Sequence, residues 1–172
     1  MILVNRQDEE LGTMPKIEAH QKALLHRAFS VFVMNRKGEV MLQQRAPNKY
    51  HSPNLWTNTC CSHQRLGESN IEAGMRRLKE EMGFRTELKE IFSFIYKAPF
   101  ENGLTEHEFD HVLLGYYEGE PHINPGEVAN WKWMLPEDIK MDMEANTSSY
   151  TTWFRIIFSR FYDHIFQKEK GL

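Results

Sequence analysis

The chain has 172 residues, a length typical of one domain, with 41% hydrophobic and 26% charged residues. This composition excludes the disordered, collagen-like and coiled-coil classes. The 21 basic and 24 acidic residues give a formal net charge of -3, so no overall positive charge attracts nucleic acid or an anionic membrane. An anionic ligand must therefore be bound by local positive charge.

The sequence lacks the apolar segments of membrane and secreted proteins. It contains no run of about 18 apolar residues, and its N-terminus, MILVNRQDEELG, turns acidic soon after its apolar start. Cys60 and Cys61 are adjacent, which argues against a disulfide between them. We therefore predict one cytoplasmic domain over residues 1–172, whose cysteines are either buried small side chains or reactive groups.

Strand signals come first along the chain. Leu25–Met34 and Glu39–Arg45 are joined by the sequence Asn-Arg-Lys-Gly, which predicts a hairpin. Trp56–Cys61 is predicted as a short third strand. Ser69 and Glu72 have capping-box spacing and begin a helix that we predict from about Asn70 to Met82, ending at Gly83.

The second half of the chain repeats the order of strands followed by helix. Glu90–Lys97, Glu108–Glu118 and Val128–Met134 are predicted strands, and Pro136 begins a short helix. From Ser148 onward, apolar residues at helical spacing predict a C-terminal amphipathic helix; they are Tyr150, Trp153, Phe154, Ile157, Phe158, Phe161 and Ile165. Strands in pairs around one central helix favour an α+β fold, a mixed α/β sandwich.

Charged pairs follow one side of the central helix. Arg77 and Glu81 are four residues apart, as are Arg76 and Glu80, and Glu68 lies just before the helix. Such a pattern is typical of a solvated helix face. It also suits a site for a metal-bound diphosphate, because Mg²⁺ prefers oxygen ligands and bridges phosphates.

A second group of residues has metal-ligand character. Glu106 and Glu108 are two residues apart in a predicted strand, so they point to the same face, where two carboxylates repel unless a cation lies between them. His20, His26 and His63 could supply imidazole ligands, although single histidines are more often surface or core residues. The others are predicted to be structural or surface residues: His51, His107, His111, His122 and His164.

The helix segment resembles the Nudix box. The matching positions are Glu68, Arg76, Leu78, Glu80, Glu81 and Gly83, with Phe84 at the end. Ser62 stands where the box begins with glycine, and Arg77 stands where Nudix hydrolases have a glutamate that binds metal for pyrophosphate cleavage. The resemblance implies a Nudix-like fold with a central mixed sheet flanked by helices, whereas the charge of Arg77 argues against hydrolysis.

The cysteine pair makes the resemblance more specific. A buried cysteine is usually inert, but a neighbouring metal or imidazole can lower the pKa of a thiol and make it an acid/base group. The string TNTCCSH, the altered Nudix helix and the later Glu-x-Glu resemble type 1 isopentenyl-diphosphate Δ-isomerases, and LHRAFS upstream and YTTW downstream match as well. The match runs from about Gly12 to the C-terminal helix.

This resemblance implies a role for each matching position. Cys61 and Glu108 would be catalytic acid/base groups, with the Tyr96 hydroxyl near Glu108. One divalent metal, Mn²⁺, Zn²⁺ or Mg²⁺, would be bound by His20, His26, His63, Glu106 and Glu108. Glu81 would contact a Mg²⁺ that enters with the diphosphate. The diphosphate itself would be bound by Lys16, Arg45, Lys49 and Arg77, and Trp153 would lie beside the hydrocarbon.

The implied reaction, part of isoprenoid biosynthesis, converts isopentenyl diphosphate into dimethylallyl diphosphate by moving a C=C bond. Adding a proton at C4 and removing one from C2 requires two acid/base groups, and an indole such as Trp153 can stabilise the intermediate carbocation. Two other functions are compatible with the sequence: a Nudix hydrolase of diphosphates and a non-enzymatic diphosphate- or metal-binding module. We expect a monomer or weak homodimer with an isoprenoid diphosphate substrate and no nucleic-acid or membrane partner.

Overall fold

The computed structural model describes residues 1–100 and 102–169, the last three of these without their side chains. The strands are β1 (Ile2–Val4), β2 (Glu10–Thr13), β3 (His26–Met34), β4 (Val40–Arg45), β5 (Trp56–Thr57), β6 (Cys60–Ser62), β7 (Leu88–Pro99), β8 (Thr105–Tyr116) and β9 (Val128–Met134). The helices are α1 (Lys16–Gln21), α2 (Asn70–Met82), α3 (Pro136–Ala145) and α4 (Thr152–Glu169), with a 3₁₀ turn over Thr147–Ser149.

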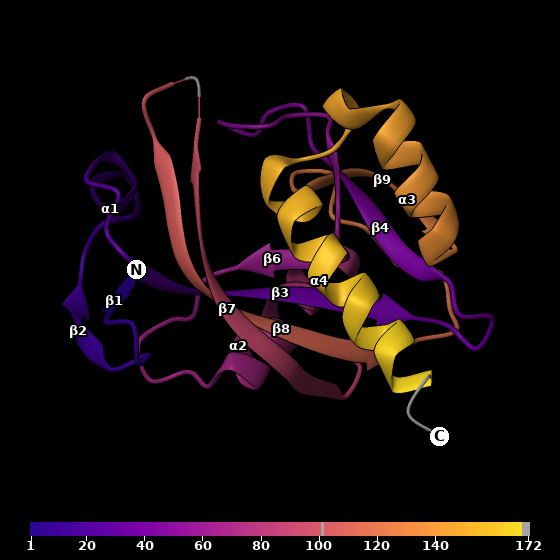
Figure 1. Cartoon of the computed structure of the whole chain (residues 1–172), viewed down its shortest axis with the longest axis horizontal. Helices are drawn as coiled ribbons and strands as arrows, with labels where there is room; N and C mark the ends of the chain where they lie inside the picture. The colour runs from indigo at the N-terminus through magenta and orange to yellow at the C-terminus, as the bar shows by residue number, and fades with distance from the viewer. Residues whose placement is uncertain (101, 170–172) are drawn as a thin grey trace.

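The described strands form one mixed sheet between helices, with α4 crossing in front of it and α2 behind it in Figure 1. Alternate residues of β3 point to opposite faces. Phe29 and Val31 pack in the cluster that contains α2, whereas Phe32 stacks on Phe161 of α4 with ring centroids 4.0 Å apart. Burying each large side chain contributes roughly 1.5–3 kcal/mol. The predicted α+β fold, a central mixed sheet flanked by helices, is confirmed.

The strands β3 and β4 separate directly after the turn that joins them. They pair only at Met34 and Val40; β3 then runs beside β6 and parallel to β8, whereas β4 runs beside β5 and β9. The predicted turn is confirmed, but the hairpin is limited to one residue pair because each strand finds its main partners elsewhere. The sheet therefore has a β3–β6–β8 half and a β4–β5–β9 half.

The segment predicted as one strand over Trp56–Cys61 forms two short strands instead. Between them, the Asn58 amide donates to backbone carbonyls of β3 and β6, at 3.1 and 2.7 Å. The Thr59 hydroxyl donates to a carbonyl of β4 at 2.6 Å and accepts from an amide of β3 at 2.9 Å. These side-chain hydrogen bonds replace strand pairing. The segment consequently crosses from one half of the sheet to the other.

The central helix has the predicted ends. Ser69 and Glu72 form both hydrogen bonds of a capping box at the N-terminus. Gly83 ends the helix with φ +79°, and a Cβ at this position would lie 2.2 Å from the carbonyl oxygen of His122. Glycine is therefore required here by both conformation and space.

The other predicted strands and helices are present, and they differ from the predictions mainly in where they begin and end. The strand β9 and the start of α3 agree with the predictions. The strand β7 is longer than predicted at both ends, whereas β8 both begins and ends earlier than predicted. The helix expected from Ser148 is a 3₁₀ turn there, and α4 begins only at Thr152. The elements β1, β2 and α1 were not predicted, because they are too short to produce a periodic pattern. Among the described residues, no helix combines the length and apolar character that crossing a membrane would require.

Candidate active site and metal centre

One cavity receives side chains from both halves of the sheet. Cys61 comes from β6 and Glu108 from β8, whereas Gln43 and Arg45 come from β4. The predicted residues that line it are Lys16, Arg45, Lys49, Cys61, His63, Arg77, Glu81, Tyr96, Glu106, Glu108 and Trp153. His20 and His26 lie outside this lining, beside Glu108. The separation of β3 from β4 thus brings together residues that are far apart in the sequence.

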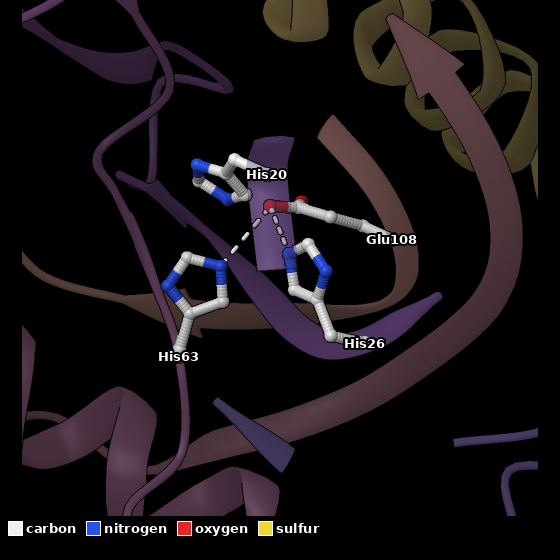
Figure 2. Close-up of side chains that lie close together, drawn as sticks. All are labelled: His20, His26, His63 and Glu108. Carbon is white, nitrogen blue, oxygen red and sulfur yellow. Dashed lines mark hydrogen bonds and ion pairs between the residues drawn. The ribbon is translucent and has the colours of Figure 1, made fainter. Parts of the chain in front are cut away.

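Three imidazole rings surround one carboxylate at the edge of the cavity (Figure 2). His20 comes from α1, His26 begins β3, His63 follows β6, and Glu108 lies on β8 opposite His26. Their ligand atoms all lie within 4.8 Å of one another. The structure therefore brings four of the predicted metal ligands into one group, which we call the histidine cluster.

The histidine cluster fits a divalent metal. His26 Nδ1 donates to the carbonyl of Leu24 at 2.8 Å, which orients the ring so that its Nε2 lies 3.5 Å from a Glu108 oxygen. The buried Nε2 of His20 has no hydrogen-bond partner among the described residues. Burial lowers the pKa of His20 and of His63 to about 4, so both rings are neutral near pH 7. Neutral imidazoles with a carboxylate suit Zn²⁺, Mn²⁺ or Fe²⁺.

Glu106 lies beside the histidine cluster, outside its group of four ligands. The Tyr96 hydroxyl is 3.0 Å from a Glu106 oxygen and 2.7 Å from a Glu108 oxygen. Burial and the charge of Glu108 raise the pKa of Glu106; burial also acts on Glu108, but hydrogen bonds from His26 and His63 lower its pKa. A hydroxyl has one proton to donate, so a protonated Glu106 can donate to Tyr96 while Tyr96 donates to Glu108.

The alternation predicted for this strand is confirmed. Glu106 and Glu108 are buried on one face, whereas His107 turns away and donates from Nδ1 to the carbonyl of Ala23 at 2.9 Å. Asp110 continues the same face; it is fully buried and accepts a hydrogen bond from Ser30 at 3.2 Å. The sequence reasoning missed Asp110, although extending the period of two by one step would have found it.

The two adjacent cysteines differ in their surroundings, and both are free thiols. Cys60 is fully buried in the core cluster on the α2 side, whereas Cys61 packs against the cluster on the α4 side and lines the cavity. Burial raises the pKa of the Cys61 thiol, although the charge of Arg45 opposes this. Each alternative reading of the cysteines thus fits one of them: Cys60 is a small core residue, and Cys61 is a protonated thiol facing the cavity.

Ion pairs around Arg77 form a second group of charged residues in the cavity lining. Arg77 bonds Glu80 at 2.8 Å, Glu81 at 2.5 Å and Glu127 at 3.2 Å. The second oxygen of Glu81 accepts from Gln43 at 2.8 Å. We call Arg77, Glu81, Glu127 and Lys49 the ion-pair cluster. The predicted Arg77–Glu81 pair is confirmed, and it lines the cavity.

The neighbouring helix pairs have no part in the cavity. Arg76 bonds Glu68 at 2.6 Å and Glu80 at 3.3 Å, and none of these three residues lines it. The two interpretations of the charged helix, a solvated face and a diphosphate site, therefore each apply to a different line of residues. The line through Arg76 ties α2 to the preceding loop, and the line through Arg77 faces the candidate site.

The positive charges of Arg45 and Lys16, the other two predicted diphosphate-binding residues, are not balanced by ion pairs among the residues that the structure describes. The guanidinium of Arg45 lies 5.0 Å from the Trp153 ring and donates to the carbonyls of His51 and Ser52, both at 3.1 Å. The ammonium of Lys16 lies 5.1 Å from the Tyr50 ring. Within the described part of the chain, no carboxylate forms an ion pair with either side chain.

Glu127 and His51 also line the cavity, and sequence reasoning missed both. His51 was predicted to be structural or at the surface, but its ring makes an edge contact with Trp153 at 5.5 Å and stacks on Phe100 at 5.1 Å. Burial lowers the pKa of His51 to about 3, so this ring is neutral. Both residues lie in loops, where no periodic pattern marks the direction of a side chain.

Comparisons with known proteins agree with this architecture. The family model of the NUDIX domain matches residues 24–154. Among solved structures, a protein of Deinococcus radiodurans has a TM-score of 0.76 at 22% identity, covering 92% of this chain and 96% of its own. A MutT protein of Methanosarcina mazei has a TM-score of 0.66 at 19% identity, covering 86% and 96%. At these identities the likeness concerns the fold alone.

The sequence relatives identify the family more narrowly than the solved structures do. "Isopentenyl-diphosphate Delta-isomerase 2" of Aromatoleum aromaticum is 46% identical over 160 residues, which cover 93% of this chain and 85% of that protein. Isopentenyl-diphosphate Delta-isomerase of Serratia proteamaculans is 45% identical over 91% and 88%, and that of Aliivibrio fischeri strain MJ11 is 43% identical over 97% of each chain. The chain therefore belongs to the Nudix superfamily and, within it, to the isopentenyl-diphosphate Δ-isomerase family.

Proposed function

We propose that this cavity isomerises isopentenyl diphosphate to dimethylallyl diphosphate with Cys61 and Glu108 as its acid/base groups. The observation that carries the proposal is their placement: Cys61 pairs with Ser30 of β3, and Glu108 pairs with His26 of the same strand, from opposite sides. Both side chains line one cavity. A flat alkene between them can receive a proton from one group and give a proton to the other.

The proton balance follows from the substrate. Protonation of C4 turns the terminal CH₂ into a methyl group and leaves a tertiary cation at C3; loss of a proton from C2 then forms the C2–C3 double bond. One group loses a proton and the other gains one, so the reverse reaction restores both. The Tyr96 hydroxyl, bonded to Glu108 at 2.7 Å, orients that carboxylate and stabilises its charged form.

The hydrocarbon end of the substrate would lie near Trp153, which is 3% exposed and packed against His51 and Phe100. The indole ring already has the Arg45 guanidinium 5.0 Å from its centroid, an arrangement that its quadrupole favours. An aromatic lining of this kind stabilises a carbocation and excludes water that would capture it. The diphosphate would lie toward Lys16, Arg45, Lys49 and Arg77.

Nudix enzymes use divalent metals, and we propose that the histidine cluster, with Glu106 beside it, holds one. A cation bound there supplies positive charge that fixes Glu108 and balances the buried carboxylates. Mn²⁺, Zn²⁺ and Mg²⁺ are the candidates for this ion. The carboxylate of Glu81, which lines the cavity on α2, is the proposed contact for a Mg²⁺ that arrives with the diphosphate.

The test follows the alkene directly. The purified full chain is incubated with Mg²⁺ and isopentenyl diphosphate in D₂O, and the product is monitored by NMR. We expect dimethylallyl diphosphate that carries deuterium in its new methyl group. Release of phosphate without movement of the double bond would instead support a Nudix hydrolase and overturn the proposal.

We propose that residues 1–172 act as a single cytoplasmic domain, as a monomer or weak homodimer, without nucleic-acid or membrane partners. Gel filtration with light scattering on the full chain measures the oligomeric state. A stable higher oligomer would contradict that part of the proposal.

A further inference from the structure

Glu127, which precedes β9, occupies an unusual position among the cations of the cavity. Its Oε2 accepts from Lys49 Nζ and from Arg77 Nη2, the latter at 3.2 Å. Burial opposes ionisation of this carboxyl group, but hydrogen bonds and charge from Lys49 and Arg77 lower its pKa. Two of the four predicted diphosphate-binding cations are therefore already bonded to one carboxylate of the chain.

The backbone holds Glu127 firmly in this position. Its carbonyl accepts from the amide of Ala46 at 3.0 Å, and its amide donates to the carbonyl of Asn124 at 2.9 Å. The amide of Asn124 in turn donates to the carbonyl of Glu81 at 2.8 Å. The loop before β9 is thus tied both to the loop that carries Lys49 and to the helix that carries Arg77. These bonds hold the backbone of Glu127, and the ion pairs with Lys49 and Arg77 hold its carboxylate in the cavity lining.

This placement has a consequence for an incoming anion. A diphosphate that approaches Lys49 and Arg77 also approaches the charge of Glu127, and like charges in a partly desolvated site repel strongly. A divalent cation that accompanies the diphosphate reduces this repulsion. Lys16 and Arg45 form no ion pair with a carboxylate among the described residues, so Glu127 offsets only two of the four predicted diphosphate-binding cations.

We propose that Glu127 is a built-in counter-anion that makes diphosphate binding depend on the accompanying divalent cation. It neutralises Lys49 and Arg77 while the cavity holds no diphosphate, and it disfavours a metal-free diphosphate or another bare polyanion. The inference rests on the proposed function, because it assumes that these cations bind a diphosphate. It adds a residue that determines which form of the diphosphate the site accepts.

The experiment measures binding without turnover. The full chain is titrated with inorganic pyrophosphate by calorimetry, with and without excess Mg²⁺, as wild type and as Glu127→Gln. The amide keeps the shape of Glu127 and removes its charge. We expect Glu127→Gln to bind metal-free pyrophosphate about tenfold more tightly than wild type, with a smaller gain from Mg²⁺. Glu127→Ala should shift binding in the same direction.

Glu80→Gln is the matched control. Glu80 bonds the same guanidinium of Arg77 at 2.8 Å but does not line the cavity. This variant should retain the Mg²⁺ dependence of the wild type, because the cavity keeps its carboxylate. An equal gain in metal-free binding from Glu80→Gln would mean that freeing Arg77 is the cause, and it would overturn the inference.

The outcomes separate this inference from the proposed function. If wild type binds pyrophosphate with Mg²⁺ but Glu127→Gln binds metal-free pyrophosphate no more tightly, the role of Glu127 is wrong and the diphosphate site stands. If wild type binds no pyrophosphate under either condition, the diphosphate site and the inference are both wrong. Isomerisation assayed on the same wild-type preparation reports independently on the reaction.

Discussion

At the histidine cluster, Glu108 faces three imidazoles, of which His20 and His63 are neutral, and the buried His20 Nε2 has no hydrogen-bond partner within the described chain. In the ion-pair cluster, by contrast, Glu81 and Glu127 are bonded to Arg77, and Glu127 also to Lys49. The histidine cluster contains no lysine or arginine to balance Glu108, whereas the ion-pair cluster contains Arg77 and Lys49. A resident metal is therefore expected at the histidine cluster, and an exchangeable one, entering with the substrate, at the ion-pair cluster.

The largest effect on turnover is expected at Cys61, which lines the cavity but belongs to neither cluster. Cys61→Ala removes an acid/base group from the cavity, so we expect turnover to fall by about 10³-fold, in the range of general acid–base catalysis. Isomerisation followed by NMR measures the loss. Cys60→Ala is the matched control: Cys60 is buried in the core, and its loss should lower the unfolding temperature while turnover persists. Equal inactivation of both variants would contradict the assignment.

The next prediction addresses the resident metal. His63→Ala removes one imidazole from the histidine cluster, so metal affinity should fall by at least about 100-fold, and turnover with it. Equilibrium dialysis with Zn²⁺ or Mn²⁺ measures the affinity. His107→Ala removes a histidine that lies between two of the site glutamates in sequence but faces away from them. That variant should bind metal like wild type, and a comparable loss would show that any histidine change disturbs the site.

A smaller effect is expected in the ion-pair cluster. Arg77→Lys keeps the charge, but one ammonium cannot replace the planar guanidinium that contacts Glu80, Glu81 and Glu127. We expect KM for the diphosphate substrate to rise about tenfold with little change in kcat. Steady-state kinetics on Arg77→Lys and Arg76→Lys make the comparison. Arg76 does not line the cavity, so a similar rise in KM for its variant would refute the distinction.

The smallest effect concerns stability and pH. A hydrogen bond from Arg76 lowers the pKa of Glu68 to about 2, below its ordinary value of 4.5. A lowered folded-state pKa stabilises the protein above pH 4.5, and this contribution is lost as the pH falls toward 2. The Glu68 side chain is partly exposed, so solvent screens the interaction and the contribution at pH 7 should be under about 1 kcal/mol. Urea unfolding of Glu68→Gln should differ from wild type at pH 7 and converge with it as the pH falls toward 2; a constant difference would exclude this linkage.

Much of the fold and site was predictable because the signals are local. The capping residues Ser69 and Glu72 and the stop at Gly83 predicted both ends of α2, and alternation predicted that Glu106 and Glu108 share a face. Family resemblance contributed the candidate residues, and most of them line one cavity. Their catalytic and binding roles stay predictions, which the variants above address.

The sequence by itself determined the helices α2, α3 and α4, the longer strands and the candidate residues, because spacing, capping and motif are properties of neighbouring positions. Tertiary structure alone decided that β3 runs parallel to β8, that Asn58 and Thr59 divide one expected strand into two, and that Glu127 reaches Lys49 and Arg77. These features depend on packing and hydrogen bonds between segments far apart in the chain. No local period records such contacts, so they become visible only once the sheet is assembled.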